Sequence, residues 1–149
     1  MKIAQFLNPQ DVISNLAATS KPQLLTALAR LAASKLKVDE EGIASALMQR
    51  EALGSTGIGD GTALPHATIA GIAAPFGLFV RLQKAIDFEA VDEVPVTLVC
   101  LLLLPPERSA AHLSALAAMA RKLSSKERRA KLRGAKSSDA LYAILTEED

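Results

Sequence analysis

An almost wholly apolar run of nine residues, Val96 to Leu104, constrains the fold of this chain more than any other feature. A strand with one face in water alternates apolar and polar residues, and this run does not. It is also far shorter than the ~20 residues that a helix needs to span a bilayer. The run therefore predicts a strand that is covered on both faces inside an α/β domain.

Helical patterns elsewhere in the chain supply the covering layers. Ser20 and Gln23 form a potential capping box ahead of an amphipathic pattern that includes Leu24, Leu28 and Leu36. We expect the α/β class, with residues 1–149 forming a single domain in which a mixed β-sheet is flanked by helices on both faces, an α/β/α sandwich. Further elements are expected as a buried strand over 76–82, short strands beside a glycine-rich segment, and helices over 39–53, 109–123, 126–133 and 138–145.

Composition narrows the function classes. The chain has 149 residues, half of them hydrophobic, which is enough to build a core without disulfides or a structural metal. A formal net charge of +1 gives no general reason to expect nucleic-acid binding or membrane insertion. The only cysteine, Cys100, lies in the apolar run and is expected to be a buried, inert thiol. With Asn8, Pro9 and Asp11 too early for a signal peptide, a cytoplasmic location is expected.

A glycine-rich segment from Arg50 to His66, R-E-A-L-G-S-T-G-I-G-D-G-T-A-L-P-H, carries the strongest functional signal. Glycines permit positive φ angles and close backbone approach, so that N–H groups can converge on a small anion. Pro65 stiffens the approach to His66, whose neutral imidazole is a good nucleophile near pH 7. We therefore predict a phosphoryl site with His66 as the phosphorylated residue. The residues expected to form its phosphate loop are Ser55, Thr56, Gly57, Gly59 and Gly61.

Other glycine-rich motifs do not fit this segment. A dinucleotide fingerprint fails because Thr62 stands where the third glycine of G-x-G-x-x-G belongs. The chain has no G-K-[ST] sequence for a Walker A loop, and Ser55 has the wrong spacing for a nucleophile elbow. A mobile glycine loop with an incidental histidine remains the alternative.

Arg50 falls near the end of the helix expected over 39–53. Ile43, Leu47 and Leu53 mark its apolar face, and Arg50 lies on that same face. A guanidinium group stays charged at neutral pH and its planar fork matches phosphate oxygens, so Arg50 is a candidate clamp for a phosphoryl group on His66. The alternative is an arginine that extends along the surface or pairs with a neighbouring acid, Glu51 or Asp60.

The other histidine, His112, is expected in the first turn of a helix. Pro105 and Pro106 end the apolar run, Ser109 is a plausible N-cap, and a helical pattern follows. A helix N-terminus favours a nearby anion, so His112 is a second candidate phosphate ligand, although such a histidine is more often a satisfied core or surface residue. No metal site is expected, because two distant histidines and one cysteine have no usual ligand spacing.

The motif R-E-x-x-G-S-T-G-I-G-x-G-x-A-L-P-H closely resembles that of the enzyme IIA domains of the bacterial phosphoenolpyruvate-dependent phosphotransferase system, fructose/mannitol class, and within it the nitrogen-regulatory IIA subfamily. Further similarity at Arg81-Leu82, Pro95-Val96 and His112-Leu113 extends it over nearly the whole chain. The chain departs from the family pattern at Pro105-Pro106, Thr97 and Ala67.

The resemblance implies a phosphocarrier that needs no cofactor. It implies that a histidine phosphocarrier protein phosphorylates His66, with Arg50 and His112 stabilising the phosphate. Two uses of the phosphate then compete. It either switches the binding of regulatory protein targets, which the nitrogen-type wording favours, or passes to a cysteine of a sugar-transport IIB domain.

One further feature is a basic segment, residues 121–136, which contains eight of the 17 lysines and arginines against one acid, Glu127. Aromatic residues interleaved with the charges would support nucleic-acid binding, and this segment has none. A solvated helix face is the simpler interpretation, and partner docking is the alternative.

Overall fold

A computed structural model describes residues 1–107 and 110–148 and contains one six-stranded mixed sheet. The strand order is β1-β5-β6-β3-β2, and β4 also pairs with β6. The strands are β1 (Leu7–Leu16), β2 (Gly57–Gly59), β3 (Thr62–Ala63), β4 (His66–Thr68), β5 (Phe76–Ile86) and β6 (Val96–Leu104). The helices are a short 3-10 turn (Ile3–Gln5), α1 (Lys21–Leu36), α2 (Glu40–Ala52), α3 (Ala110–Ser124), α4 (Lys126–Gly134) and α5 (Ser138–Thr146).

β6 is the central strand, as its apolar sequence predicts. It pairs with β5 in an antiparallel arrangement on one side, and with β3 and then β4 in parallel on the other. Eight of its nine residues are buried, and only Thr97 is partly exposed. Cys100 is fully buried in the middle of this strand, as expected.

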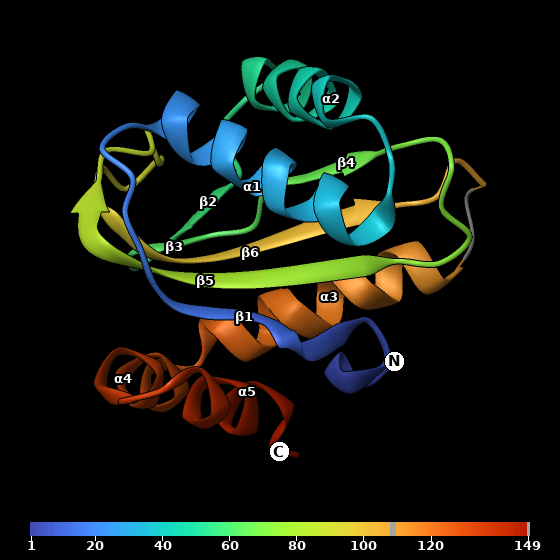
Figure 1. The fold of residues 1–149 in the computed structure, drawn as a ribbon. Coiled ribbons are helices and arrows are strands. Elements are labelled where there is room, and N and C mark those ends of the chain that lie inside the picture. Colours follow the sequence, from blue (N-terminus) through green and yellow to red (C-terminus); the bar gives the residue numbers. More distant parts are fainter. Residues whose placement is uncertain (108–109, 149) are drawn as a thin grey trace.

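Helices cover the sheet on both faces, which confirms the predicted fold class. Figure 1 shows α1 and α2 above the sheet and α3, α4 and α5 below it. Two apolar cores result, because alternate residues of β6 point to opposite faces. Leu101 and Leu103 pack with residues of α1 and α2, whereas Leu98 and Leu102 pack with residues of α3, α4 and α5.

The helix boundaries follow the local sequence signals closely. Ser20 caps α1, its hydroxyl oxygen accepting from the Gln23 amide at 3.2 Å, as predicted. The observed helices otherwise match the expected ranges to within one or two residues. The expected N-cap of α3, Ser109, lies outside the described residues.

Two strands differ from expectation. β5 continues past Leu82 to Ile86. Its added residues Gln83, Lys84 and Ala85 are exposed, so no run of apolar residues marked them as part of a strand in the sequence. β1 was not predicted, because a proline, Pro9, lies within it and its burial does not alternate along the strand. Within residues 1–107 and 110–148, no helix has the length and apolarity that crossing a membrane requires.

Candidate functional site

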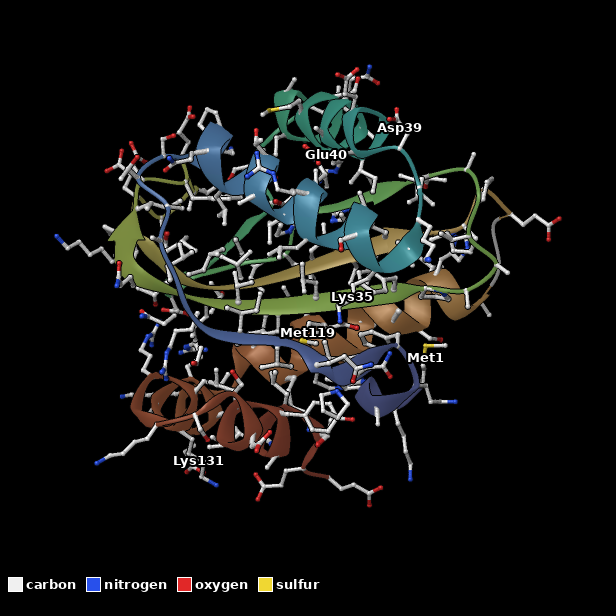
Figure 2. The ribbon with its side chains drawn as sticks, in the orientation of Figure 1. Met1, Lys35, Asp39, Glu40, Met119 and Lys131 are labelled. Atoms are coloured by element: carbon white, nitrogen blue, oxygen red, sulfur yellow. The ribbon has the colours of Figure 1, made fainter. Side chains whose placement is uncertain are left out.

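Arg50 reaches the site from the last turn of α2. The helix starts after Asp39, which Figure 2 labels at this end of α2 and whose carboxylate accepts from the Gly42 amide at 3.0 Å. Ile43 and Leu47 are buried as predicted. Arg50 itself is half-buried, and its Nη1 donates to the Gly54 carbonyl at 2.9 Å, just beyond the helix end. The guanidinium is thereby held at the junction between α2 and the glycine-rich segment.

Neither neighbouring acid pairs with Arg50. The Glu51 carboxylate lies 2.6 Å from the Lys21 ammonium, and the Asp60 carboxylate lies 3.6 Å from Arg129. The expectation for Leu53 was wrong, because this side chain is 85% exposed and does not continue the apolar face of α2. It lies at the C-cap, where the chain leaves the helix.

His66 is the first residue of β4 and is half-buried at the edge of the sheet. Buried Leu64 and Pro65 precede it, and the Leu64 carbonyl lies 2.8 Å from His66 Nδ1. A carbonyl only accepts hydrogen bonds, so Nδ1 of the neutral ring carries the proton and Nε2 presents a lone pair. The backbone therefore fixes both the tautomer and the orientation of the ring.

Arg50 and His66 line the same hollow of about 320 Å³. Figure 1 shows α2 lying above β4, which brings the end of the helix over this edge strand. The other lining residues were not predicted to belong to this site, because nothing distinguishes them from ordinary helix and strand residues. They are Ala46, Gln49, Leu53, Ala67 and Thr68.

His112 approaches from the opposite face of the sheet. It lies in the first turn of α3, as predicted, and is 8% exposed. Its Nε2 atom has no hydrogen-bond partner among the described residues, which is unusual for a buried polar atom. His112 does not line the hollow shared by Arg50 and His66.

The strand register nevertheless directs His66 toward the face that carries α3. His66 pairs with Leu102, whose side chain belongs to the core beneath α3, whereas the next residue, Ala67, packs with α1 and α2. Alternation along β4 thus turns the His66 side chain to the α3 face at the sheet edge. Arg50 therefore lies on the α2 face of this sheet edge, and His112 lies on the α3 face.

The structure does not bring the expected phosphate-loop residues to this hollow. Ser55 Oγ donates to the Phe88 carbonyl at 3.2 Å and accepts from the Gly57 amide at 3.0 Å. Buried Thr56 donates from its amide and its hydroxyl to the Glu51 carboxylate. Both side chains therefore hold the segment to its surroundings, and neither lines the hollow.

The glycines form part of a β-hairpin made by β2 and β3. Gly57 and Gly59 lie in β2, and Gly59 and Gly61 have φ angles of +95° and +79° at the turn into β3. At Gly61 a Cβ atom would lie 2.6 Å from Arg133 Nη2 and 3.2 Å from the Pro95 carbonyl, so close packing explains this glycine. The turn packs against α4, and a role of these residues in holding phosphate stays a prediction.

A buried polar network that the sequence analysis missed lies next to the site. The Lys21 side chain is 11% exposed and that of Glu51 6%, and the Lys21 ammonium lies 4.6 Å from the centre of the Phe88 ring. Glu51 connects Lys21 of α1 with Thr56 of the hairpin segment. Within the part of the chain that the structure describes, no group of three or more potential ligands is placed to hold a metal ion.

Fold and site together define a class of small α/β/α domain that presents one histidine, with an arginine beside it, at the edge of a mixed sheet. The chain belongs to the family described as "Phosphoenolpyruvate-dependent sugar phosphotransferase system, EIIA 2", whose model matches residues 5–148. The family resemblance in the sequence is thereby confirmed.

Relatives of this chain carry a nitrogen-regulatory name. The nitrogen regulatory protein of Bradyrhizobium diazoefficiens is 41% identical over 145 residues, which cover 97% of this chain and 95% of that protein. The crystal structure of nitrogen regulatory protein IIA-Ntr from Neisseria meningitidis has a TM-score of 0.91 and 33% identity, covering 97% of this chain and 99% of that chain.

The same fold occurs in a complex of enzyme IIAMTL and phosphorylated enzyme IIBMTL from Escherichia coli. The TM-score is 0.77 at 17% identity, covering 93% of this chain and 95% of that chain. At this identity the likeness concerns the fold alone.

Proposed function

We propose that this protein is a nitrogen-type regulatory phosphocarrier of the phosphotransferase system, transiently phosphorylated on Nε2 of His66. The observation that carries the proposal is the hydrogen bond between His66 Nδ1 and the Leu64 carbonyl. It leaves the Nε2 lone pair as the nucleophile of the ring. Family membership supports phosphoryl transfer, and the names of the relatives support the regulatory role.

The proposed donor is a phosphohistidine on a histidine phosphocarrier protein. The Nε2 lone pair of His66 attacks the phosphorus in line, and the donor N–P bond breaks. The donor imidazole, protonated on its other nitrogen, leaves with the bonding electron pair as neutral histidine. His66 keeps its Nδ1 proton on the Leu64 carbonyl, so the ring gains a phosphoryl group without moving a proton.

Arg50 and His112 are the proposed electrostatic partners of the phosphoryl group. Arg50 lines the hollow beside His66 and carries a permanent charge that suits phosphate oxygens. His112 has a buried Nε2 atom without a protein partner among the described residues, in the first turn of α3. A phosphoryl oxygen there would satisfy this nitrogen and would be favoured by the positive end of the helix.

The hairpin residues have an indirect role in this proposal. Ser55 and Thr56 fix the segment to Phe88 and Glu51, and Gly57, Gly59 and Gly61 shape the hairpin from which Leu64 and Pro65 lead to His66. Their hydrogen bonds favour positioning of the histidine over direct contact with phosphate.

Phosphorylation with phosphoenolpyruvate and the cognate general phosphotransfer enzymes tests the proposal. We expect acid-labile, alkali-stable label on His66, with ¹⁵N and ³¹P NMR assigning it to Nε2. His66→Ala should accept no label and should remain folded, because its side chain is only half-buried. Label that persists in His66→Ala, or that resides on Nδ1, would overturn the assignment.

The sugar-transport alternative differs in what happens next. A transport component passes its phosphate to a cysteine of a IIB domain, whereas a regulatory phosphocarrier changes its binding of protein targets. Incubating the phosphorylated protein with IIB domains of the fructose and mannitol type separates the two. Rapid transfer to a IIB cysteine would favour transport.

A further inference from the structure

A second hollow, of about 570 Å³, lies at the other end of the sheet and is strongly basic. Its lining contains three cations, Arg81, Arg133 and Lys136, with polar side chains from β1, β5 and β6. One lining residue, Leu82, is apolar, and none of the described residues that line it is a carboxylate. Figure 1 shows that β5 ends above α4, and the lining residues of the hollow come from these two elements and from β1 and β6 or lie just after α4.

This hollow is separate from the one at His66. Arg81 pairs with Leu98 in the sheet, whereas His66 pairs with Leu102. These two partners lie four residues apart on β6, which corresponds to about 13 Å along the strand. The two hollows share no lining residue.

Arg81 is held in place by neutral acceptors. Its Nη1 donates to the carbonyls of Leu132 at 2.8 Å and Ala135 at 2.6 Å, and its Nε donates to the Ser14 carbonyl at 3.2 Å. These contacts fix the guanidinium beside the end of α4 without bringing a carboxylate to it. Its charge is therefore preorganised.

The other two cations also lack acidic partners. Arg133 Nη2 donates to the Asp60 carbonyl at 2.5 Å, while the Asp60 carboxylate faces Arg129. Lys136 is exposed. In the part of the chain that the structure describes, neither forms an ion pair, and Arg81 forms none either.

Three other cations of the basic segment are used differently. Arg128 and Lys131 face the Glu147 carboxylate at 3.1 and 3.7 Å, and buried Arg129 binds the Leu123 carbonyl at 3.0 Å. These residues attach α4 to its neighbours. The uncompensated charge of the segment at this end of the sheet is thus concentrated on Arg133 and Lys136, next to Arg81.

We propose that this hollow binds a small multivalent oxyanion, a metabolite that carries phosphate or carboxylate groups. Arg81 offers an oxyanion its Nη2 atom and a fixed charge, because carbonyls already occupy its Nε and Nη1 atoms. The guanidinium of Arg133 and the ammonium of Lys136 add charge-assisted donors that suit phosphate and carboxylate oxygens alike. The volume lies in the range of small-molecule sites, and the polar lining disfavours an apolar ligand. The site does not depend on the proposed role of His66.

Titration of the whole protein with pyrophosphate, and separately with citrate, tests this site by backbone amide NMR. At about 0.1 M salt, where nonspecific surface attraction is largely screened, we expect saturable shifts at Ser14, Thr97 and Lys136. The ligand that binds more tightly identifies phosphate or carboxylate as the preferred group. Arg81 is left unchanged, because its removal would disturb the end of α4.

Two double variants with the same change in net charge give the control. Arg133→Gln with Lys136→Gln should weaken binding by about tenfold or more, because two charge-assisted contacts are lost. Arg121→Gln with Lys126→Gln removes two exposed cations of the same segment outside the hollow and should leave binding unchanged. Lys136→Gln alone should weaken binding without touching the Arg133–Asp60 contact.

Three results would overturn the proposal. The first is that neither anion gives saturable shifts. The second is equal weakening in both double variants, which would indicate nonspecific attraction to the basic segment. The third is a set of shifts centred on His66, which would place the anion in the other hollow.

Discussion

At the scale of single residues, Arg50 combines two tasks that substitution can separate. Its Nη1 atom binds the Gly54 carbonyl at the end of α2, and its side chain lines the hollow at His66. A lysine keeps the charge but loses the planar fork that holds two phosphate oxygens. Helix propensity hardly differs between the two residues, so stability and function should respond differently.

We expect Arg50→Lys to slow phosphoryl transfer by about a hundredfold or more, since one preorganised contact in a transition state is typically worth about 2 to 4 kcal/mol. The thermal midpoint should hardly move. Arg30→Lys is the matched control, because Arg30 is an exposed arginine of α1 that lies 3.9 Å from Glu40 and does not line the hollow at His66. Transfer rates and thermal midpoints of the wild type, Arg50→Lys and Arg30→Lys test this prediction. An unchanged transfer rate in Arg50→Lys would leave Arg50 only its structural task.

His112 gives a second prediction at this scale, in which stability and function move in opposite directions. A buried nitrogen without a partner costs about 1 to 3 kcal/mol, and an apolar residue of similar size avoids this cost. His112→Leu should therefore keep or raise the free energy of unfolding, while phosphoryl transfer to His66 slows by about tenfold or more. Denaturant unfolding and transfer rates test both parts. A loss of several kcal/mol in stability would mean that His112 is a satisfied core residue.

At the scale of elements, the contact between Lys21 and Glu51 ties α1 and α2 to the start of the hairpin. The Glu51 side chain is 6% exposed and accepts from Thr56 as well as from Lys21. Removing one member of a buried pair leaves the other charge without its partner, which typically costs about 3 to 5 kcal/mol. Glu51→Ala should approach this range in denaturant unfolding. It should also slow transfer at His66, because the segment leading to the histidine loses its anchor.

An exposed ion pair provides the control for this prediction. Lys2 and Glu148 lie 2.7 Å apart, nearly the same separation as Lys21 and Glu51, but both side chains are about three-quarters exposed. Pairs of this kind contribute little to stability, so Glu148→Ala should leave unfolding unchanged within error. Equal effects of Glu51→Ala and Glu148→Ala would show that burial of the Lys21–Glu51 pair adds nothing.

The elements also show what sequence could and could not predict. The start of α2 and the place of Arg50 follow from local signals, namely a capping aspartate and a helical apolar spacing. The hairpin does not, because glycine permits many conformations and the one adopted here depends on Arg133, Pro95 and Asp92, which are distant in sequence. The exposure of Leu53 was mispredicted for a related reason: the helix ends just before it, so helical periodicity no longer applies.

At the scale of the whole molecule, the predictable part of the fold is the part determined by burial. The apolar sequence of β6 requires cover on both faces, and the helices supply it. The pairing partners of β6 were not predictable in the same way, since strand order depends on contacts between distant segments. The juxtaposition of Arg50 with His66 is of this kind, because it arises only when α2 packs over β4.

Cys100 offers a global test of this buried centre. Burial raises the pKa of its thiol far above the usual range, whereas the unfolded chain should have an ordinary value of about 8.5. Above that pH the unfolded state loses the proton and the folded state keeps it, so stability is complete at lower pH and falls as pH rises. Between pH 7.5 and 9.5 this single group should lower the free energy of unfolding by about 1.4 kcal/mol.

Urea unfolding at several pH values, on wild type and Cys100→Ala, measures this contribution. The variant is less stable at every pH because it leaves a small cavity, but the difference between the two proteins should shrink by about 1.4 kcal/mol from pH 7.5 to 9.5. The comparison cancels the titration of lysines and the tyrosine, which both proteins share. A difference that stays constant with pH would mean that the thiol ionises as readily in the folded chain as in the unfolded one, and hence that the centre of β6 opens to water without global unfolding.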